Sequence, residues 1–106
     1  MEFIETKIFT KRVLDILKDG HFGLFQASLI ANPESGSIIK GSGGIRKIRW
    51  SIGGKGKRGG IRILYQWLPE KNQVYLLFLF QKNEQDNLTP KQLETLRKLM
   101  EGEKDG

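Results

Sequence analysis

The chain of 106 residues contains no cysteine and only one histidine. Without cysteine it forms no disulfide and no thiolate metal site, and a single histidine is too few for a histidine-based zinc site. We therefore expect neither a metal nor a cofactor. The absence of cysteine also fits the reducing cytosol, so the expected location is cytoplasmic.

Long apolar runs and acidic residues are scarce as well. No apolar stretch approaches the roughly 20 residues that a membrane span needs, and the amino terminus lacks the basic and then apolar pattern of a signal peptide. We therefore expect a soluble intracellular protein without a membrane partner. Eighteen basic residues against twelve acidic ones give a net charge of +6. This excess favours a polyanion such as nucleic acid over an acidic small molecule as the partner.

Apolar spacing predicts helices at both ends of the chain and strands between them. Residues 9–20 and 21–33 show helical periodicity and are expected to form a hairpin, while residues 2–6 suggest a short edge strand. Residues 45–52 and 60–68 alternate with period two around the glycine-rich segment 53–60, which predicts an antiparallel hairpin. Residues 74–80 are apolar at both parities, as in a central strand. A capping pattern of Thr89, Pro90 and Gln92 begins the last helix.

These elements predict a single α+β domain over residues 1–106. A twisted antiparallel sheet would carry the N-terminal helical hairpin and the C-terminal helix packed on it. Residues 102–106 are expected to fray.

The middle of the chain concentrates positive charge. No acidic residue occurs between Glu34 and Glu70, and this segment contains seven clustered cations, namely Arg46, Lys47, Arg49, Lys55, Lys57, Arg58 and Arg62. Such a cluster destabilises the compact state unless an anion neutralises it.

Three of these cations are expected to converge on one face of the sheet. Lys47 and Arg49 are two residues apart on a strand, and Arg62 points away from the apolar residues of its own strand. A solvated sheet face is the ordinary explanation for such a pattern, but a solvated face normally mixes acids with bases. The sequence therefore favours phosphate binding. Because of its parity we also expect Arg62 at the surface, so that Arg62→Ala leaves the fold intact.

Other chemical candidates are weaker. His21 lies between two helical segments without a nearby acid or cysteine, which favours a structural role. Glu84 and Asp86 suggest a carboxylate pair or metal site, but a solvated loop before a capped helix explains them equally well.

Three long motifs of the chain resemble those of a known protein family. "GSGGIRKIRW", "GKGKRGGIRILYQW" and "VYLLFLFQKNEQDNLT", with the spacing between them, resemble the RelE/ParE superfamily of bacterial toxins, and most closely its HigB-like group. The resemblance covers nearly the whole chain. It implies a type II toxin that enters the ribosomal A site and cleaves mRNA there. It also implies a cognate antitoxin, usually with a helix-turn-helix domain, through which the complex binds operator DNA.

The resemblance also implies site residues. The family's strand cations match Lys47 and Arg49, the arginine that opens the next strand matches Arg62, and Lys82 falls where the family has basic residues after its last strand. Two positions depart from the pattern. Where RelE itself carries an arginine this chain has Asn83, and the catalytic tyrosine is replaced by Leu88 or has no counterpart.

These residues suit cleavage of RNA without a metal, because the 2'-hydroxyl of RNA is the nucleophile. The enzyme must deprotonate it, stabilise the phosphorane and assist the leaving 5'-oxygen. Lys47, whose neutral form is favoured by its charged neighbours, is the candidate base, Arg62 offers a planar fork to the phosphate, and Lys82 is a candidate acid. A further group is expected to grip mRNA and ribosomal RNA, namely Arg46, Lys55, Lys57 and Arg58.

The main alternative is a protein without catalytic activity. ParE-like members of the superfamily inhibit gyrase and do not cleave RNA, and a plain RNA-binding module would use the same basic face. Fold membership alone does not decide between these functions.

Overall fold

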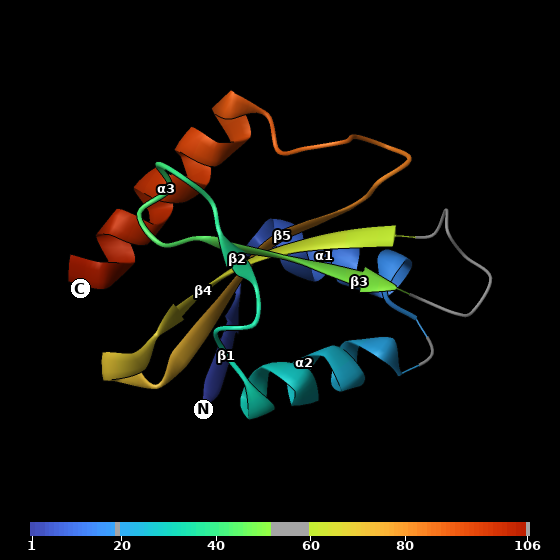
Figure 1. The fold of residues 1–106 in the computed structure, drawn as a ribbon, viewed down its shortest axis with the longest axis horizontal. Coiled ribbons are helices and arrows are strands. Elements are labelled where there is room, and N and C mark those ends of the chain that lie inside the picture. The colour runs from blue at the N-terminus through green and yellow to red at the C-terminus, as the bar shows by residue number, and fades with distance from the viewer. Residues whose placement is uncertain (19, 52–59, 106) are drawn as a thin grey trace.

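The structure is a computed structural model that describes residues 1–18, 20–51 and 60–105. Five strands, three α-helices and one short 3-10 helix follow one another along these residues (Figure 1). In chain order they are β1 (Glu2–Glu5), α1 (Lys7–Ile16), α2 (His21–Ala31), β2 (Ser37–Ile38), β3 (Arg46–Ser51), β4 (Gly60–Leu68), η1 (Pro69–Lys71), β5 (Gln73–Gln81) and α3 (Pro90–Asp105).

The strands form one sheet in the order β1-β5-β4-β3-β2. All neighbouring pairs are antiparallel except β1 and β5, which run parallel. The expected hairpin of β3 and β4 and the short edge strand β1 are both present. The α+β fold is therefore confirmed, with the parallel edge pair as a refinement of the antiparallel sheet that we expected.

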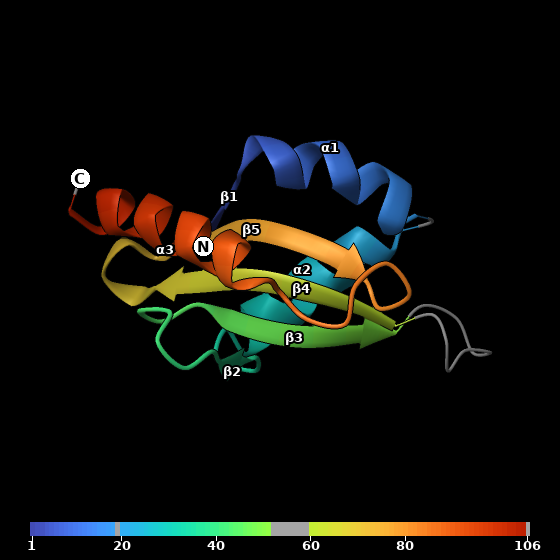
Figure 2. The ribbon, with the colours of Figure 1, turned by 90° about the horizontal axis from the view of Figure 1, so that it is seen from above.

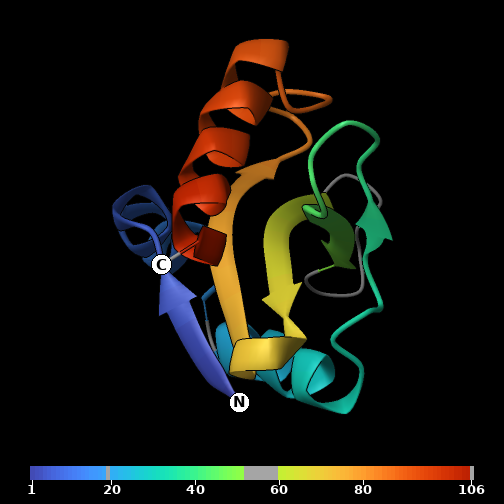
Figure 3. The same ribbon diagram turned by 90° about the vertical axis from the view of Figure 1, so that its left-hand side faces the viewer.

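Helices cover both faces of this sheet (Figure 2). One core packs α1 and α2 against the sheet through residues such as Phe9, Phe25 and Ile63. A second core packs α3 against the opposite face through Leu96 and Met100. The end-on view in Figure 3 shows α3 along one side of the curved strands and α2 at their far end. The central strands are thus enclosed from two sides.

This enclosure corrects the expectation for Arg62. Its side chain does point away from Ile61 and Ile63, but the face it points to is itself covered, and Arg62 is only 8% exposed. On β4 it lies between Arg49 of β3 and Phe80 of β5. Parity identified the face correctly and the exposure wrongly, because the sequence pattern does not show which side chains of the neighbouring strands flank Arg62, namely Arg49 and Phe80.

The last helix begins as predicted. The Thr89 hydroxyl accepts from the Gln92 N–H at 3.1 Å, and the Gln92 side chain accepts from the Thr89 N–H at 3.0 Å, which completes a capping box. Residues 102–105 are helical, and fraying of this tail stays a prediction. None of the helices among the described residues is long and apolar enough to cross a membrane.

A buried tyrosine fixes the loop between α2 and β2. The Tyr65 hydroxyl donates to the Pro33 carbonyl at 2.9 Å and accepts from the Gly36 N–H at 2.9 Å. A Cβ at Gly36 would lie 2.9 Å from the Tyr65 ring, so the loop approaches this closely only with glycine there. Arg46 reinforces the loop by donating to the carbonyls of Glu34 and Gly36 at 3.1 and 2.7 Å. Tyr65 therefore has a structural role in the hairpin.

We expect Tyr65→Phe to lower the free energy of unfolding by about 1–3 kcal/mol, because it leaves the partly buried Pro33 carbonyl and the buried Gly36 N–H without their shared partner. Tyr75→Phe is the matched control, since the Tyr75 hydroxyl bonds only the exposed Glu103 carboxylate among the described residues and should cost less. Urea unfolding of both variants measures the difference. Equal losses would show that the Tyr65 hydroxyl does not fix the loop.

Candidate functional site

Three basic residues of β3 and β4 share the face of the sheet on which α3 packs. Arg49 is directly opposite Arg62, and Lys47 is opposite Leu64, which belongs to the core beneath α3. Opposite residues of an antiparallel pair share a face, as do residues two apart on one strand. The structure thus brings together the three residues that we expected to converge, and we call Lys47, Arg49 and Arg62 the basic face.

Exposure decreases across the basic face. Arg49 is exposed, Lys47 is half-buried and Arg62 is buried. Among the described residues none of the three forms an ion pair. Like charges directly opposite each other on neighbouring strands are destabilising. An anion placed between Arg49 and Arg62 would relieve that repulsion.

The guanidinium of Arg62 is held close to the backbone of its own strand. A Cβ at Gly60 would lie 3.2 Å from Arg62 Nη1, so glycine leaves room for the guanidinium to fold back along β4. Nη1 is buried and has no hydrogen-bond partner among the described residues. A buried donor without a partner is costly, and a phosphate oxygen is a strong acceptor for a guanidinium.

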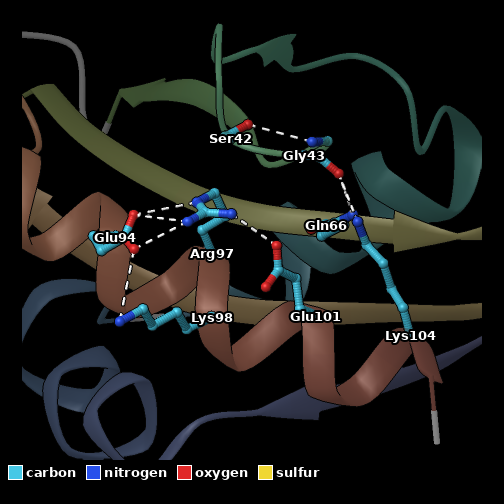
Figure 4. A network of polar contacts seen from close by, with 9 residues as sticks. Ser42, Gly43, Gln66, Glu94, Arg97, Lys98, Glu101 and Lys104 are labelled. Atoms are coloured by element: carbon cyan, nitrogen blue, oxygen red, sulfur yellow. Dashed lines mark hydrogen bonds and ion pairs between the residues drawn. The ribbon is translucent and has the colours of Figure 1, made fainter.

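The outer side of α3 shows what an ordinary solvated surface looks like in this protein (Figure 4). Arg97 pairs with Glu94 at 2.9 Å and with Glu101 at 2.7 Å, and Lys98 approaches Glu94 at 3.7 Å. Positive and negative side chains alternate along this helix and neutralise one another. In the part of the chain that the structure describes, no acid pairs with the basic face, which separates it from a merely solvated surface.

The other predicted cations are placed differently. Arg46 is opposite Tyr65 and therefore points to the face covered by α1 and α2, where it holds the loop after α2. It is not part of the basic face, although its role in RNA binding stays a prediction. Lys55, Lys57 and Arg58 lie outside the described residues.

Lys82 stands beside the beginning of β4. Its backbone N–H donates to the Gly60 carbonyl at 3.0 Å, which places it two residues from Arg62 along the sheet, and its side chain is exposed. The neighbouring departure Asn83 is exposed in the same turn. Leu88, the other departure, is half-buried and packs against the core beneath α3.

An ion pair stabilises the turn that contains Lys82, and the sequence pattern did not reveal it. Arg12 of α1 donates from Nη2 to Glu84 at 2.7 Å and from Nε to the Leu79 carbonyl at 2.8 Å, and its guanidinium lies 5.0 Å from the centre of the Phe78 ring. Glu84 also accepts from the Gln81 N–H at 3.1 Å. The hydrogen bond from Arg12, followed by that from Gln81, holds the pKa of Glu84 below its ordinary value.

Glu84 is therefore occupied by Arg12 and not paired with Asp86 for catalysis. No group of three or more histidine, cysteine, aspartate or glutamate side chains in residues 1–18, 20–51 and 60–105 could hold a metal ion. Arg12 is 72 positions from Glu84, so no local pattern indicates the pair. Gly60 lies within the glycine-rich segment, where nothing distinguishes it from its neighbours.

Comparisons with known proteins show the family and the fold of the chain. A family model described as "RelE toxin of RelE / RelB toxin-antitoxin system" matches residues 6–104. A mutant of the E. coli toxin RelE, solved in the free state, is 16% identical with a TM-score of 0.58 over 80% of this chain and 86% of its own. A chain of the intact E. coli RelBE toxin-antitoxin complex is 17% identical with a TM-score of 0.55 over 76% of this chain and 94% of its own. At these identities the two structures show a shared fold.

We expect Glu84→Gln to lower the free energy of unfolding at neutral pH by about 0.5–1 kcal/mol, as for a well-formed exposed ion pair. Because the pKa of Glu84 is lower in the folded chain than in the unfolded chain, its contribution is present above the unfolded value and is lost as the pH falls through the folded value. Thermal unfolding at neutral pH and near pH 3 should therefore show wild type and variant converging in acid.

Asp86→Asn is the control for this experiment, since it removes a carboxylate charge from the same loop without removing a contact of Arg12. It should change stability at neutral pH less than Glu84→Gln does. A stability difference between wild type and Glu84→Gln that persists in acid would contradict the assignment of the effect to the Arg12 ion pair.

Proposed function

Because the chain belongs to the RelE toxin family, we propose that it is a ribosome-dependent mRNA endonuclease of a type II toxin-antitoxin system. It inhibits translation by cleaving mRNA in the ribosomal A site, and within the family it belongs to the HigB-like group. The observation that carries the proposal is the basic face, where Arg49 stands opposite a buried Arg62 and neither forms an ion pair within residues 1–18, 20–51 and 60–105.

Cleavage follows from the chemistry of RNA and needs no metal. The 2'-hydroxyl loses its proton to Lys47, and its oxygen attacks the adjacent phosphorus. The bond from phosphorus to the 5'-oxygen then breaks, and Lys82 supplies the proton for that oxygen, which leaves a cyclic phosphate on the upstream fragment. Arg62 and Arg49 stabilise the negative charge that grows on the phosphorane.

Burial suits Arg62 to this task. A guanidinium stays protonated at any relevant pH, and a fork that is packed between strands loses little freedom when it binds a phosphate. We propose that Lys82, in the braced turn beyond β5, acts from the same side of the hairpin. Lys55, Lys57, Arg58 and Arg46 contribute contacts to mRNA and ribosomal RNA.

The partner that controls this activity is a cognate antitoxin, in keeping with the family description and with the E. coli complex. We propose that it carries a helix-turn-helix domain, that an acidic or apolar segment of it orders on binding near the basic face, and that operator DNA is bound only through the complex. Toxin, antitoxin and ribosome meet in the cytoplasm.

Substitutions in the basic face test the proposal. Arg49→Gln removes an exposed charge, and Arg62→Lys keeps the charge but loses the fork, so neither creates the cavity that Arg62→Ala would leave. Each should reduce the rate of mRNA cleavage by about a hundredfold to a thousandfold, as expected for a lost charge-stabilising group. Primer extension on translated mRNA measures the cuts, with the same mRNA lacking ribosomes alongside.

Lys98→Gln is the matched control, since it removes one positive charge from the mixed surface of α3 and should cleave like wild type. Cuts that appear equally without ribosomes would overturn ribosome dependence. Growth arrest by the wild-type chain without any RNA cleavage would replace the nuclease with a non-enzymatic toxin such as a gyrase inhibitor.

Salt dependence gives a second test. Each phosphate contact lowers the logarithm of the affinity for single-stranded RNA by about 0.7 per tenfold increase in salt, so three contacts from the basic face predict a slope of at least about 2. Arg49→Gln should lower that slope by about 0.7, whereas Lys98→Gln should leave it unchanged. Fluorescence anisotropy of a labelled RNA at several salt concentrations gives these slopes. A flat response would exclude phosphate binding by this face.

A further inference from the structure

Helix α2 carries no charged residue and is mostly apolar, and its polar residues are His21, Gln26 and Ser28. Its eleven residues, "HFGLFQASLIA", include no aspartate, glutamate, lysine or arginine. Phe25 and Leu29 point into the core, as expected for the inner side of a packed helix. A surface helix of a soluble protein normally has a charged or polar outer side, and a helix that is apolar all round is normally buried.

The outer side of α2 is nevertheless exposed. Leu24 is 60% and Ile30 is 59% exposed, and the small residues Gly23, Ala27 and Ala31 are exposed between and beside them. Apart from the adjoining residues and backbone of α2 itself, no atom of the described residues lies within 4 Å of the position that a Cβ on Gly23 would occupy, so packing against the rest of the chain does not require glycine there. Figure 1 shows α2 along one edge of the molecule, away from α3. This surface, which we call the α2 face, is ready to be covered by another chain.

The order of side chains on the α2 face is symmetric about Ala27. Three positions before and after it stand the large residues Leu24 and Ile30, and four positions before and after it stand the small residues Gly23 and Ala31. A two-fold axis through Ala27 would pair Leu24 of one copy with Ile30 of the other, and Gly23 with Ala31. Such self-complementarity is what a two-fold symmetric contact requires, since residue i meets j and j meets i.

Electrostatics favour the same arrangement. Neither the first nor the last turn of α2 carries a charged side chain that would offset the helix dipole. An antiparallel second copy brings each positive helix end close to a negative one. The α2 face and the basic face also belong to opposite sides of the sheet. Two chains of charge +6 can therefore meet through α2 while Lys47, Arg49 and Arg62 of one copy stay apart from those of the other.

We propose that a second copy of this chain docks on the α2 face as an antiparallel helix pair centred on Ala27. Small residues at the crossing let the two helices approach closely, and Leu24 and Ile30 pack on either side. A helix of this length is about 16 Å long, so the contact falls at the small end of protein interfaces and the dimer is expected to be weak. The inference is independent of the proposed function.

Sedimentation equilibrium of the full chain at concentrations up to about 1 mM tests this association, a range suited to weak interfaces. The apparent mass of the wild type should rise toward twice that of the chain. Leu24→Lys and Ile30→Lys should hold it at the mass of one chain, because each buries an unpaired charge in the pair. Leu14→Lys is the matched control, since Leu14 is 75% exposed on α1, outside the α2 face, and should associate like wild type.

Cross-linking tests the symmetry directly. The chain has no cysteine, so Ala27→Cys introduces a single thiol, and two copies related by the proposed axis bring their Cα atoms within the roughly 4.4–6.8 Å that a disulfide spans. Mild oxidation should convert most of Ala27→Cys to a covalent dimer. Leu14→Cys should stay largely monomeric under the same conditions.

The proposal is overturned if the wild type remains monomeric at the highest concentration, or if Ala27→Cys and Leu14→Cys cross-link equally slowly. It is also overturned if the α2 face is covered only in complex with the antitoxin, which would make the antitoxin the occupant. If the wild-type chain is monomeric but still cleaves mRNA, the proposed dimer is rejected and the proposed nuclease function remains. A concentration-dependent dimer without cleavage would reject only the nuclease.

Discussion

Two arginines stand opposite each other across β3 and β4, and the register of this hairpin forces them together. On the other face of the same strands Ile48 meets Ile63 and Trp50 meets Ile61, and these residues contact the core under α1 and α2. A shift by one residue would turn that apolar set outward. The core therefore fixes the register, and the register places Arg49 beside Arg62 despite their repulsion. Packing of the apolar face of β3 and β4 therefore keeps the two arginines together on the opposite face.

The sequence was most informative where local rules act. The cap of α3, the β3–β4 hairpin and the position of the helical segments depend on neighbours in the chain, and the structure confirms each of them. Period-two alternation also assigned Arg62 to the correct face. Its burial was missed because exposure depends on side chains of the neighbouring strands, which only the tertiary fold brings beside it. The ion pair of Arg12 and Glu84 was missed for the same reason, since it joins α1 to the turn after β5.

The two helical layers differ in how they meet solvent. The outer side of α3 carries several charged side chains that pair with one another, so it is stable in water without a partner. The outer side of α2 has no charged residue and exposes Leu24 and Ile30. Both helices pack their inner sides against the sheet. The two helices differ in their exposed side chains, which packing within the chain does not determine. The fold alone therefore does not explain why the exposed side chains of α2 are apolar.

Gly60 determines how the Arg62 guanidinium of the basic face packs against β4. A side chain at this position would press on Arg62 Nη1, so glycine permits the guanidinium to lie flat along β4 with that nitrogen buried. Leaving a buried donor without a partner costs on the order of 1–3 kcal/mol. Arg62 Nη1 has no hydrogen-bond partner in residues 1–18, 20–51 and 60–105. Under the proposed function a phosphate oxygen accepts from it, so the free energy that its burial costs the free protein is recovered when the substrate binds. Repulsion between Arg49 and Arg62 acts in the same direction, because an anion between them removes it. The buried Arg62 donor and the repulsion between Arg49 and Arg62 therefore both destabilise the free protein, and a bound phosphate relieves both.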